Sequence, residues 1–195
     1  MWLSSSKFIA DKYGHVVEYG LDDSGATTVT KWYTMGRQAL EMAEILPDDK
    51  TVYISDDGTN TMMTAFVMDT PKDLSSGTLY IAKFNQTDDK YGGSFDVEWI
   101  ELGSATQDEL SAMVNNITFD DIFEYTEPTI EGQSCSCPDG FTGINAGHGS
   151  GSPQCLKVKD GMETAAAFFE TRRYGAMMGG TTELSKFEGY VGICR

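Results

Sequence analysis

The chain has 195 residues, of which 14 are Lys or Arg and 30 are Asp or Glu, so its formal net charge is −16. A chain this acidic is a poor partner for nucleic acid or for an anionic membrane surface, because both would repel it. No stretch of about 18 apolar residues occurs, so the sequence predicts no membrane-spanning helix. Surplus carboxylates are typical of a solvated acidic surface, and they are also the ligands that Ca²⁺ prefers.

The N-terminal half is a series of short β-branched and aromatic segments separated by polar turns, a pattern that predicts strands. The expected strands are, in chain order, residues 7–10, 15–19, 27–32, 51–55, 64–68, 78–84 and 95–102. Such close spacing favours a sandwich, a barrel or a propeller. The segment 35–46 is ambiguous, because its residues favour a helix while its apolar positions would also suit a buried strand.

The second half changes in character. Thr106 and Glu109 frame a capping box that opens a short helix, and Thr118 opens a further helical turn over residues 119–125. Residues 131–154 are rich in Gly, Ser and Pro and predict a loop, whereas residues 159–180 contain the longest expected helix. The apolar face of that helix is expected to consist of Ala165, Phe168, Phe169, Ala176 and Met177.

Four cysteines are present, at Cys135, Cys137, Cys155 and Cys194. Pairing of Cys155 with either Cys137 or Cys135 would close the Gly/Ser-rich loop, which has little core of its own and gains most from such a link. One or two disulfides and an oxidising compartment, extracellular or periplasmic, are therefore expected. A zinc site is the alternative, although His148 is the only nearby histidine and the spacing matches no common zinc finger.

Two motifs in the N-terminal half carry charges suited to chemistry. Residues 36–41 place Arg37 and Glu41 behind a glycine, and a surface ion pair is the simplest interpretation. Asp56 and Asp57 follow the strand at 51–55, where adjacent carboxylates repel each other unless a cation or a donor compensates. They predict either a turn or a pair of Ca²⁺ ligands.

Two further motifs lie near the C-terminus. Arg172 and Arg173 on the last expected helix could clamp a phosphate group, although a face of helix salt bridges is the simpler interpretation. Lys186 and Glu188 follow the glycines at 179–180. A cationic side chain two residues before a carboxylate, in a segment that follows a pair of glycines ending the helix, suits an anion or metal site.

Taken together and in this order, the motifs resemble the PhoX family of alkaline phosphatases. The resemblance covers nearly the whole chain, with matching motifs at 36–43, 53–57, 77–84, 99–102 and 172–188, and it corresponds to the C-terminal half or less of the family's length. It implies a mainly β fold, namely the C-terminal blades of a six-bladed β-propeller with a few short helices and one longer C-terminal helix. Residues 131–156 would be a Cys/Gly/Ser-rich loop inserted into this partial propeller.

The resemblance also implies an activity, the hydrolysis of phosphate monoesters by a cluster of ferric iron and calcium. Lys186 and Arg37 match phosphate-facing positions, although Lys186 replaces an arginine and so lacks its bidentate fork. Leu40 stands where the family has a histidine. The residues that match metal-ligand positions are Glu41, Asp56, Asp57 and Glu188.

Further iron ligands would come from the missing N-terminal part of the same propeller, so the chain is expected to be part of a longer exported protein. By itself it is expected to show little or no phosphatase activity. The alternative is a non-catalytic, calcium-binding extracellular β-propeller or interaction protein, which the substitutions at Leu40 and Lys186 favour slightly.

Overall fold

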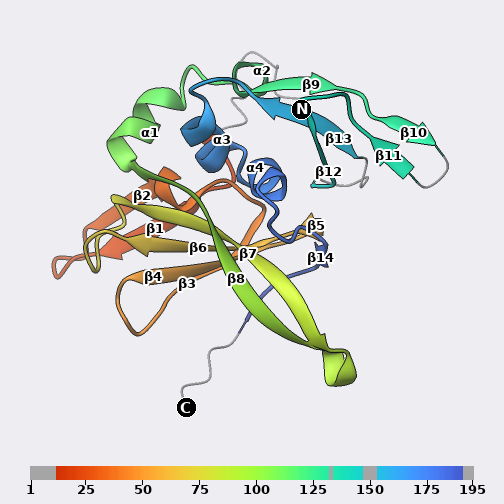
Figure 1. The fold of residues 1–195 in the computed structure, drawn as a ribbon. Coiled ribbons are helices and arrows are strands. Elements are labelled where there is room, and N and C mark those ends of the chain that lie inside the picture. The colour runs from red at the N-terminus through yellow and green to blue at the C-terminus, as the bar shows by residue number, and fades with distance from the viewer. Residues whose placement is uncertain (1–11, 132–133, 147–152, 191–195) are drawn as a thin grey trace, which may run out of the picture.

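The protein was analysed as a computed structural model that describes residues 12–131, 134–146 and 153–190. Its largest element is a five-stranded antiparallel sheet in the order β3-β4-β6-β7-β8 (Figure 1). Neighbouring strands in this sheet are also neighbours along the chain, apart from the short β5, so the sheet is a meander. Its strands are β3 (Leu40–Ile45), β4 (Thr51–Asp56), β6 (Met63–Met68), β7 (Ser76–Asp88) and β8 (Ser94–Thr106).

Smaller sheets surround this meander. They are a β1-β2 hairpin, a three-stranded β12-β13-β9 sheet, a β10-β11 pair and a β5-β14 pair. Their strands are β1 (Val16–Leu21), β2 (Thr27–Trp32), β5 (Thr59–Thr61), β9 (Phe123–Thr126), β10 (Thr129–Glu131), β11 (Ser134–Ser136), β12 (Thr142–Ile144), β13 (Gln154–Val158) and β14 (Leu184–Ser185). The predicted mainly β class is confirmed, and among the described residues no sheet closes into a barrel or a propeller.

Short helices join the two largest sheets. Helices α3 and α4 lie between the five-stranded sheet and the β12-β13-β9 sheet (Figure 1). Phe168 and Phe169 of α3 are fully buried in the same apolar core as Phe66 of β6 and Ile81 of β7. The helices are α1 (Gln107–Met113), α2 (Phe119–Ile122), α3 (Glu163–Phe169) and α4 (Thr171–Met177), with single 3-10 turns η3 (Tyr33–Met35) and η4 (Lys90–Gly92).

The close approach of α4 to the sheet depends on a glycine. A Cβ atom at Gly175 would lie only 2.4 Å from Cδ1 of Ile81, so a larger residue would require the Ile81 side chain or the helix to move. The small residues of this segment therefore let α4 rest directly on β7. This packing sets the distance between the sheet and the start of α4, where two arginines of the candidate site are located.

Most of the expected strands and helix starts are confirmed. Strands β2, β4, β6, β7 and β8 cover the predicted segments, and the capping box formed by Thr106 and Glu109 opens α1. The turn opened by Thr118 is shorter than predicted, because α2 ends at Ile122 and the chain continues as β9. The strand expected at 7–10 lies outside the described residues.

Two expectations about element type are corrected. Within the ambiguous segment 35–46, residues 40–45 form the edge strand β3, because their backbone pairs with β4 and this pairing overrides the helix preference. This strand is largely exposed rather than buried. The single long helix expected within 159–180 is instead two helices separated at Glu170, whose φ of −130° and ψ of 43° are not helical. The predicted loop at 131–154 contains β11 and β12.

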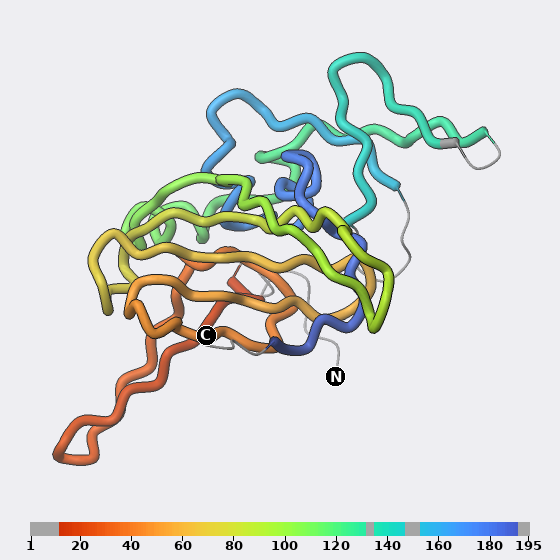
Figure 2. The backbone as a smooth tube through the Cα atoms, turned by 60° about the horizontal axis from the view of Figure 1, so that its bottom comes forward, coloured from red at the N-terminus to blue at the C-terminus, as the bar shows by residue number. Residues whose placement is uncertain are grey.

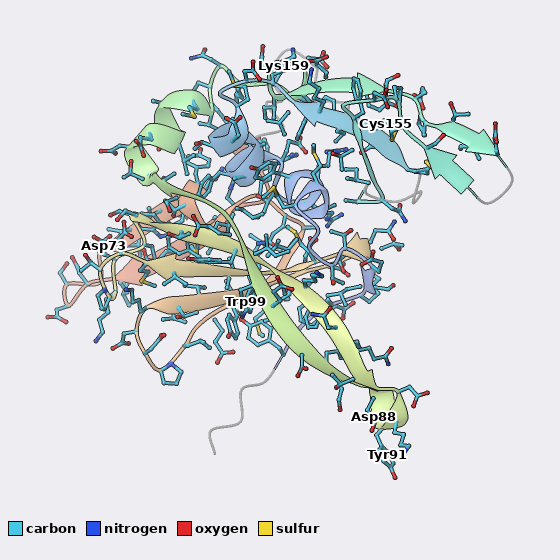
Figure 3. The ribbon with its side chains drawn as sticks, viewed as in Figure 1. Asp73, Asp88, Tyr91, Trp99, Cys155 and Lys159 are labelled. Atoms are coloured by element: carbon cyan, nitrogen blue, oxygen red, sulfur yellow. A yellow bond between two sulfur atoms is a disulfide. The ribbon has the colours of Figure 1, made fainter. Side chains whose placement is uncertain are left out.

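Two hairpins extend from the body of the molecule. The β1-β2 hairpin projects to one side (Figure 2), and the far end of the β7-β8 hairpin carries the fully exposed Tyr91 (Figure 3). Strand alternation and register place Val17, Tyr19, Leu21 and Val29 on one face of the β1-β2 hairpin, and each of them is more than half exposed. This hairpin therefore presents an uncovered apolar face.

The C-terminal segment returns to the face of the main sheet that points away from α3 and α4. The hydroxyl of Tyr190 donates a hydrogen bond to the carbonyl oxygen of Tyr53, and the two rings meet edge to face with centroids 5.9 Å apart. Tyr53 in turn stacks on Trp99, which is labelled on β8 in Figure 3. Burial raises the pKa of Tyr190 to about 12.

This shift predicts a pH-dependent detachment of the C-terminal segment. Because the pKa of Tyr190 is higher in the folded chain than the ordinary value of 10.0, its neutral form favours folding. The stabilisation is present below pH 10 and is lost as the pH rises towards about 12. In an absorbance titration of tyrosinate, Tyr190→Phe should remove a component that titrates near pH 12. Identical titration curves for the two proteins would contradict the assignment.

Candidate functional site

Three arginines line one pocket of about 400 Å³. Arg37 lies in the segment before β3, whereas Arg172 and Arg173 lie in the first turn of α4. The remaining lining residues come from the same segments, from the chain before β1 and from the end of the β12 segment: Tyr13, Gly14, Gln38, Ala39, Ala146, Phe169, Glu170 and Thr171. Segments that are more than a hundred residues apart in the chain thus contribute three arginines to the lining of one cavity.

Arg37 is held in place along its whole length. Its backbone N–H donates to the hydroxyl of Thr171 at 2.9 Å, and its Nε donates to the carbonyl oxygen of Tyr13 at 3.1 Å. Its Nη1 lies 3.3 Å from the carbonyl oxygen of Phe169. The preceding Gly36 has a φ of 74°, and a Cβ atom there would lie 2.7 Å from the Thr171 hydroxyl, so only glycine permits this approach.

Glu170 bridges two of the arginines. Its Oε2 lies 2.5 Å from Nη1 of Arg173, and its Oε1 lies 3.4 Å from Nη1 of Arg37. The Glu170 side chain is only 8% exposed, and it sits at the break between α3 and α4. Arg173 is further fixed by Gln154, whose Oε1 accepts from its Nε at 3.0 Å, and by the ring of Phe119, whose centroid lies 5.2 Å from the guanidinium carbon.

Arg172 forms a bidentate pair with Asp56. Its Nε and Nη2 donate to the two carboxylate oxygens at 2.8 and 2.5 Å. The carboxylate also accepts from the backbone N–H groups of Ala39 at 2.8 Å and Met62 at 3.3 Å. Burial raises the pKa of Asp56, and its hydrogen bonds and the charge of Arg172 offset part of that rise. Both oxygens of Asp56, which is fully buried, therefore already have donors from the protein.

The other predicted site residues gather around Lys186. Its Nζ donates to the two oxygens of Asp57 at 3.1 and 3.3 Å. Asp57 is the main cause of a raised pKa of Lys186, and the negative charges of Glu188 and Glu41 raise it further. The negative charges of Glu41, Asp57 and Glu188 thus all act on Lys186, whereas Asp56 belongs to the arginine pair and Lys186 lies outside the pocket that contains Arg37.

The predicted metal ligands do not form a metal site by themselves in the described part of the chain. In the described part of the chain, no three His, Cys, Asp or Glu side chains are arranged to hold a metal ion. Asp56 does not fit the role of a ligand, because Arg172 and two backbone amides already use its oxygens. The acidic residues around Lys186 have ligand chemistry suited to calcium but do not complete a coordination shell by themselves.

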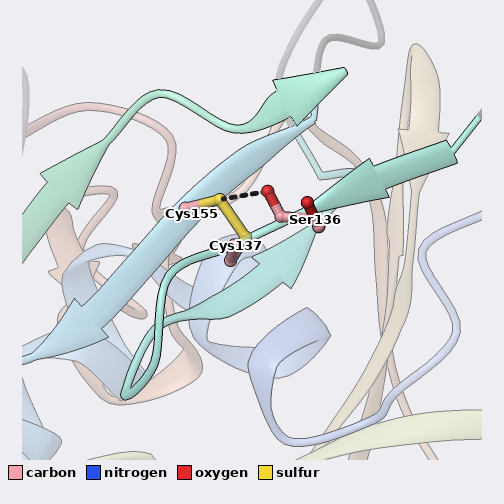
Figure 4. Close-up of a disulfide and its surroundings, with 3 residues drawn as sticks. All are labelled: Ser136, Cys137 and Cys155. Atoms are coloured by element: carbon pink, nitrogen blue, oxygen red, sulfur yellow. Dashed lines mark hydrogen bonds between the residues drawn. A yellow bond between two sulfur atoms is a disulfide. The ribbon is translucent and has the colours of Figure 1, made fainter. Parts of the chain in front are cut away.

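A disulfide fastens the small sheet beside the pocket. Cys137 is bonded to Cys155 of β13, 18 residues further along the chain (Figure 4). Of the two pairings that the sequence left open, this one is confirmed, and Cys135 carries an exposed free thiol. The bond uses two of the cysteines that the zinc alternative required. Gln154, next to Cys155, contacts Arg173, so the disulfide anchors a strand that supports the pocket.

Comparison of the chain with models of known protein families, with curated proteins and with solved structures gave no match. None of the helices that the structure describes is long and apolar enough to cross a membrane. The geometry of the arginine pocket is therefore the main indication of function.

Sequence reasoning missed Glu170 and Gln154 as members of the site. Both lie in segments whose local pattern gave them no special role, a helix interior and a loop. The available signal was Thr171, a residue type that prefers helix starts to helix interiors and that marks the break in the predicted helix.

Proposed function

We propose that the chain recognises the phosphoryl group of a phosphate monoester in the arginine pocket, as part of a PhoX-like phosphate monoester hydrolase. The observation that carries this proposal is the convergence of Arg37, Arg172 and Arg173 on one pocket of about 400 Å³. The planar guanidinium fork matches the geometry of phosphate oxygens, and arginine is the residue best suited to binding them.

The charge balance of the pocket supports an anionic ligand. Three guanidinium groups are set against the carboxylates of Asp56 and Glu170, so positive charge is in excess in a chain whose net charge is −16. Arg172 is locked by Asp56 and Arg37 is locked by backbone carbonyl groups. Because the donors are fixed before the ligand arrives, little conformational entropy is lost on binding.

The role of these arginines in hydrolysis would be to hold the phosphoryl group and to offset the charge on its oxygens in the transition state. The resemblance to the PhoX family adds calcium and ferric iron, with Glu41, Asp57 and Glu188 as ligand positions. The described residues do not complete a ligand set, so no step is assigned to a metal, and both ions stay a prediction of the resemblance. The alternative, a non-catalytic calcium-binding propeller, is supported by the acidic residues around Lys186 and by the substitutions at Leu40 and Lys186.

The partial propeller is also part of this proposal. A meander of antiparallel strands is the unit from which propeller blades are built. The apolar face of the β1-β2 hairpin, formed by Val17, Tyr19, Leu21 and Val29, would pack against the further blades that a complete propeller requires. The disulfide supports a secreted or periplasmic location, because such bonds persist in oxidising compartments.

Phosphate binding by the chain tests the proposed function. Replacement of Arg173 by alanine removes one guanidinium from the pocket and is expected to weaken the binding of inorganic phosphate about tenfold or more. Isothermal titration calorimetry measures this affinity without requiring turnover. The matched control is Lys157→Ala, which removes a positive charge paired with Glu124 on the small sheet, outside the pocket. Equal losses for the two variants, or no binding by the wild type, would refute the proposal.

A further inference from the structure

Glu170 is an acidic residue in a pocket otherwise suited to anions. Its carboxylate lies between Arg37 and Arg173, it is among the residues that line the cavity, and its side chain is 8% exposed. Asp56, which pairs with the third arginine of the pocket, Arg172, is fully buried and does not line the cavity. Glu170 is therefore the negative charge that a bound anion would meet most directly.

The effect of Glu170 on a ligand is electrostatic rather than steric. A guanidinium group carries five N–H donors. Glu170 forms one ion pair with Arg173 and one with Arg37. Arg173 is also held by a hydrogen bond to Gln154. The two arginines are thus anchored by neutral groups as well, including the carbonyl oxygens that bind Arg37. Removing the charge of Glu170 would leave these anchors in place.

The repulsion between Glu170 and a bound anion grows with the charge of the anion. By Coulomb's law, a dianion is repelled about twice as strongly as a monoanion at the same position. We infer that Glu170 is a specificity-determining residue, which lowers the affinity of the arginine pocket for dianionic phosphates relative to monoanionic ones. The inference rests on the proposed function. In the proposed hydrolase the effect falls on the monoester substrate as well as on the inorganic phosphate that hydrolysis releases, because both are mainly dianions at about pH 8.

The test uses the full chain and two methyl esters of phosphate. Methyl phosphate is mostly a dianion at pH 8, since the second pKa of a phosphate monoester is about 6, whereas dimethyl phosphate is a monoanion. Calorimetric titration of Glu170→Gln is expected to show about tenfold tighter binding of methyl phosphate and about threefold tighter binding of dimethyl phosphate. The selectivity for the dianion should therefore rise about threefold, and added salt should reduce the change.

Two further variants control for charge and for structure. Glu163→Gln removes a charge from the exposed first turn of α3, outside the pocket, and should change neither affinity more than about twofold. Glu170→Asp keeps the charge and should keep the wild-type selectivity. Selectivity that shifts as much in Glu170→Asp as in Glu170→Gln would overturn the inference, and so would a loss of binding in Glu170→Gln.

The outcomes also separate this inference from the proposed function. If the wild type binds both esters and Glu170→Gln leaves their ratio unchanged, only the assignment of Glu170 fails. If the wild type and Glu170→Gln bind neither ester, the arginine pocket is not a phosphate site, and the inference fails together with the proposed function.

Discussion

Replacement of Asp56 by alanine is expected to lower the free energy of unfolding by about 3–5 kcal/mol, because it leaves a charged group buried without its partner. Arg172 is only 11% exposed, and Asp56 is its bidentate counter-ion. The backbone N–H groups of Ala39 and Met62 would lose their acceptor in the same step. Urea denaturation followed by circular dichroism measures the change.

The neighbouring residue provides the matched control. Asp57 pairs with Lys186, whose side chain is 66% exposed, and such exposed pairs contribute at most about 1 kcal/mol. Asp57→Asn should therefore lower the free energy of unfolding much less than Asp56→Ala does. The loss in Asp56→Ala should be the same with and without a calcium chelator, because its counter-ion is an arginine. A mild Asp56→Ala, or a loss that depends on calcium, would show that this carboxylate is not primarily the partner of Arg172.

The sequence predicted the elements whose signal is local. The β-branched run at 51–55 became β4, and its alternation places Val52 and Ile54 in the core while Tyr53 faces the opposite side. The capping box formed by Thr106 and Glu109 needed only four adjacent residues to be recognised. The segment 35–46 lacked such a signal, because whether it becomes a helix or a strand depends on pairing with β4.

The partners within the site could not be predicted in the same way. Arg172 and Arg173 were expected to form salt bridges on the face of a helix, and Arg173 does pair with Glu170 three residues away. Arg172 instead pairs with Asp56, 116 residues distant, and no local pattern contains that information. The resemblance to a known family grouped Glu41, Asp57 and Glu188, which lie near Lys186 in the structure. The bridging role of Glu170 depends on the helix break and was visible only in three dimensions.

Loss of the disulfide is expected to lower the free energy of unfolding by about 3 kcal/mol, the entropy that a link over a loop of this length removes from the unfolded chain. Cys137 and Cys155 are 18 residues apart. Because Cys155 adjoins Gln154, which accepts from Arg173, the same change should weaken phosphate binding severalfold. The suitable variant is the double replacement Cys135→Ser and Cys137→Ser, since Cys137→Ser alone would leave the thiol of Cys135 available to pair with Cys155 in its place.

The single variant Cys135→Ser is the control for this experiment. Its thiol is exposed and forms no disulfide, so its replacement should leave both stability and phosphate affinity close to those of the wild type. Thermal unfolding and calorimetric titration of the three proteins separate two roles of the bond. A double variant that is less stable but binds phosphate normally would show that the disulfide only restrains the loop. A parallel loss of affinity would show that the disulfide helps to position Arg173 through β13. The small sheet would then contribute to phosphate binding in the arginine pocket.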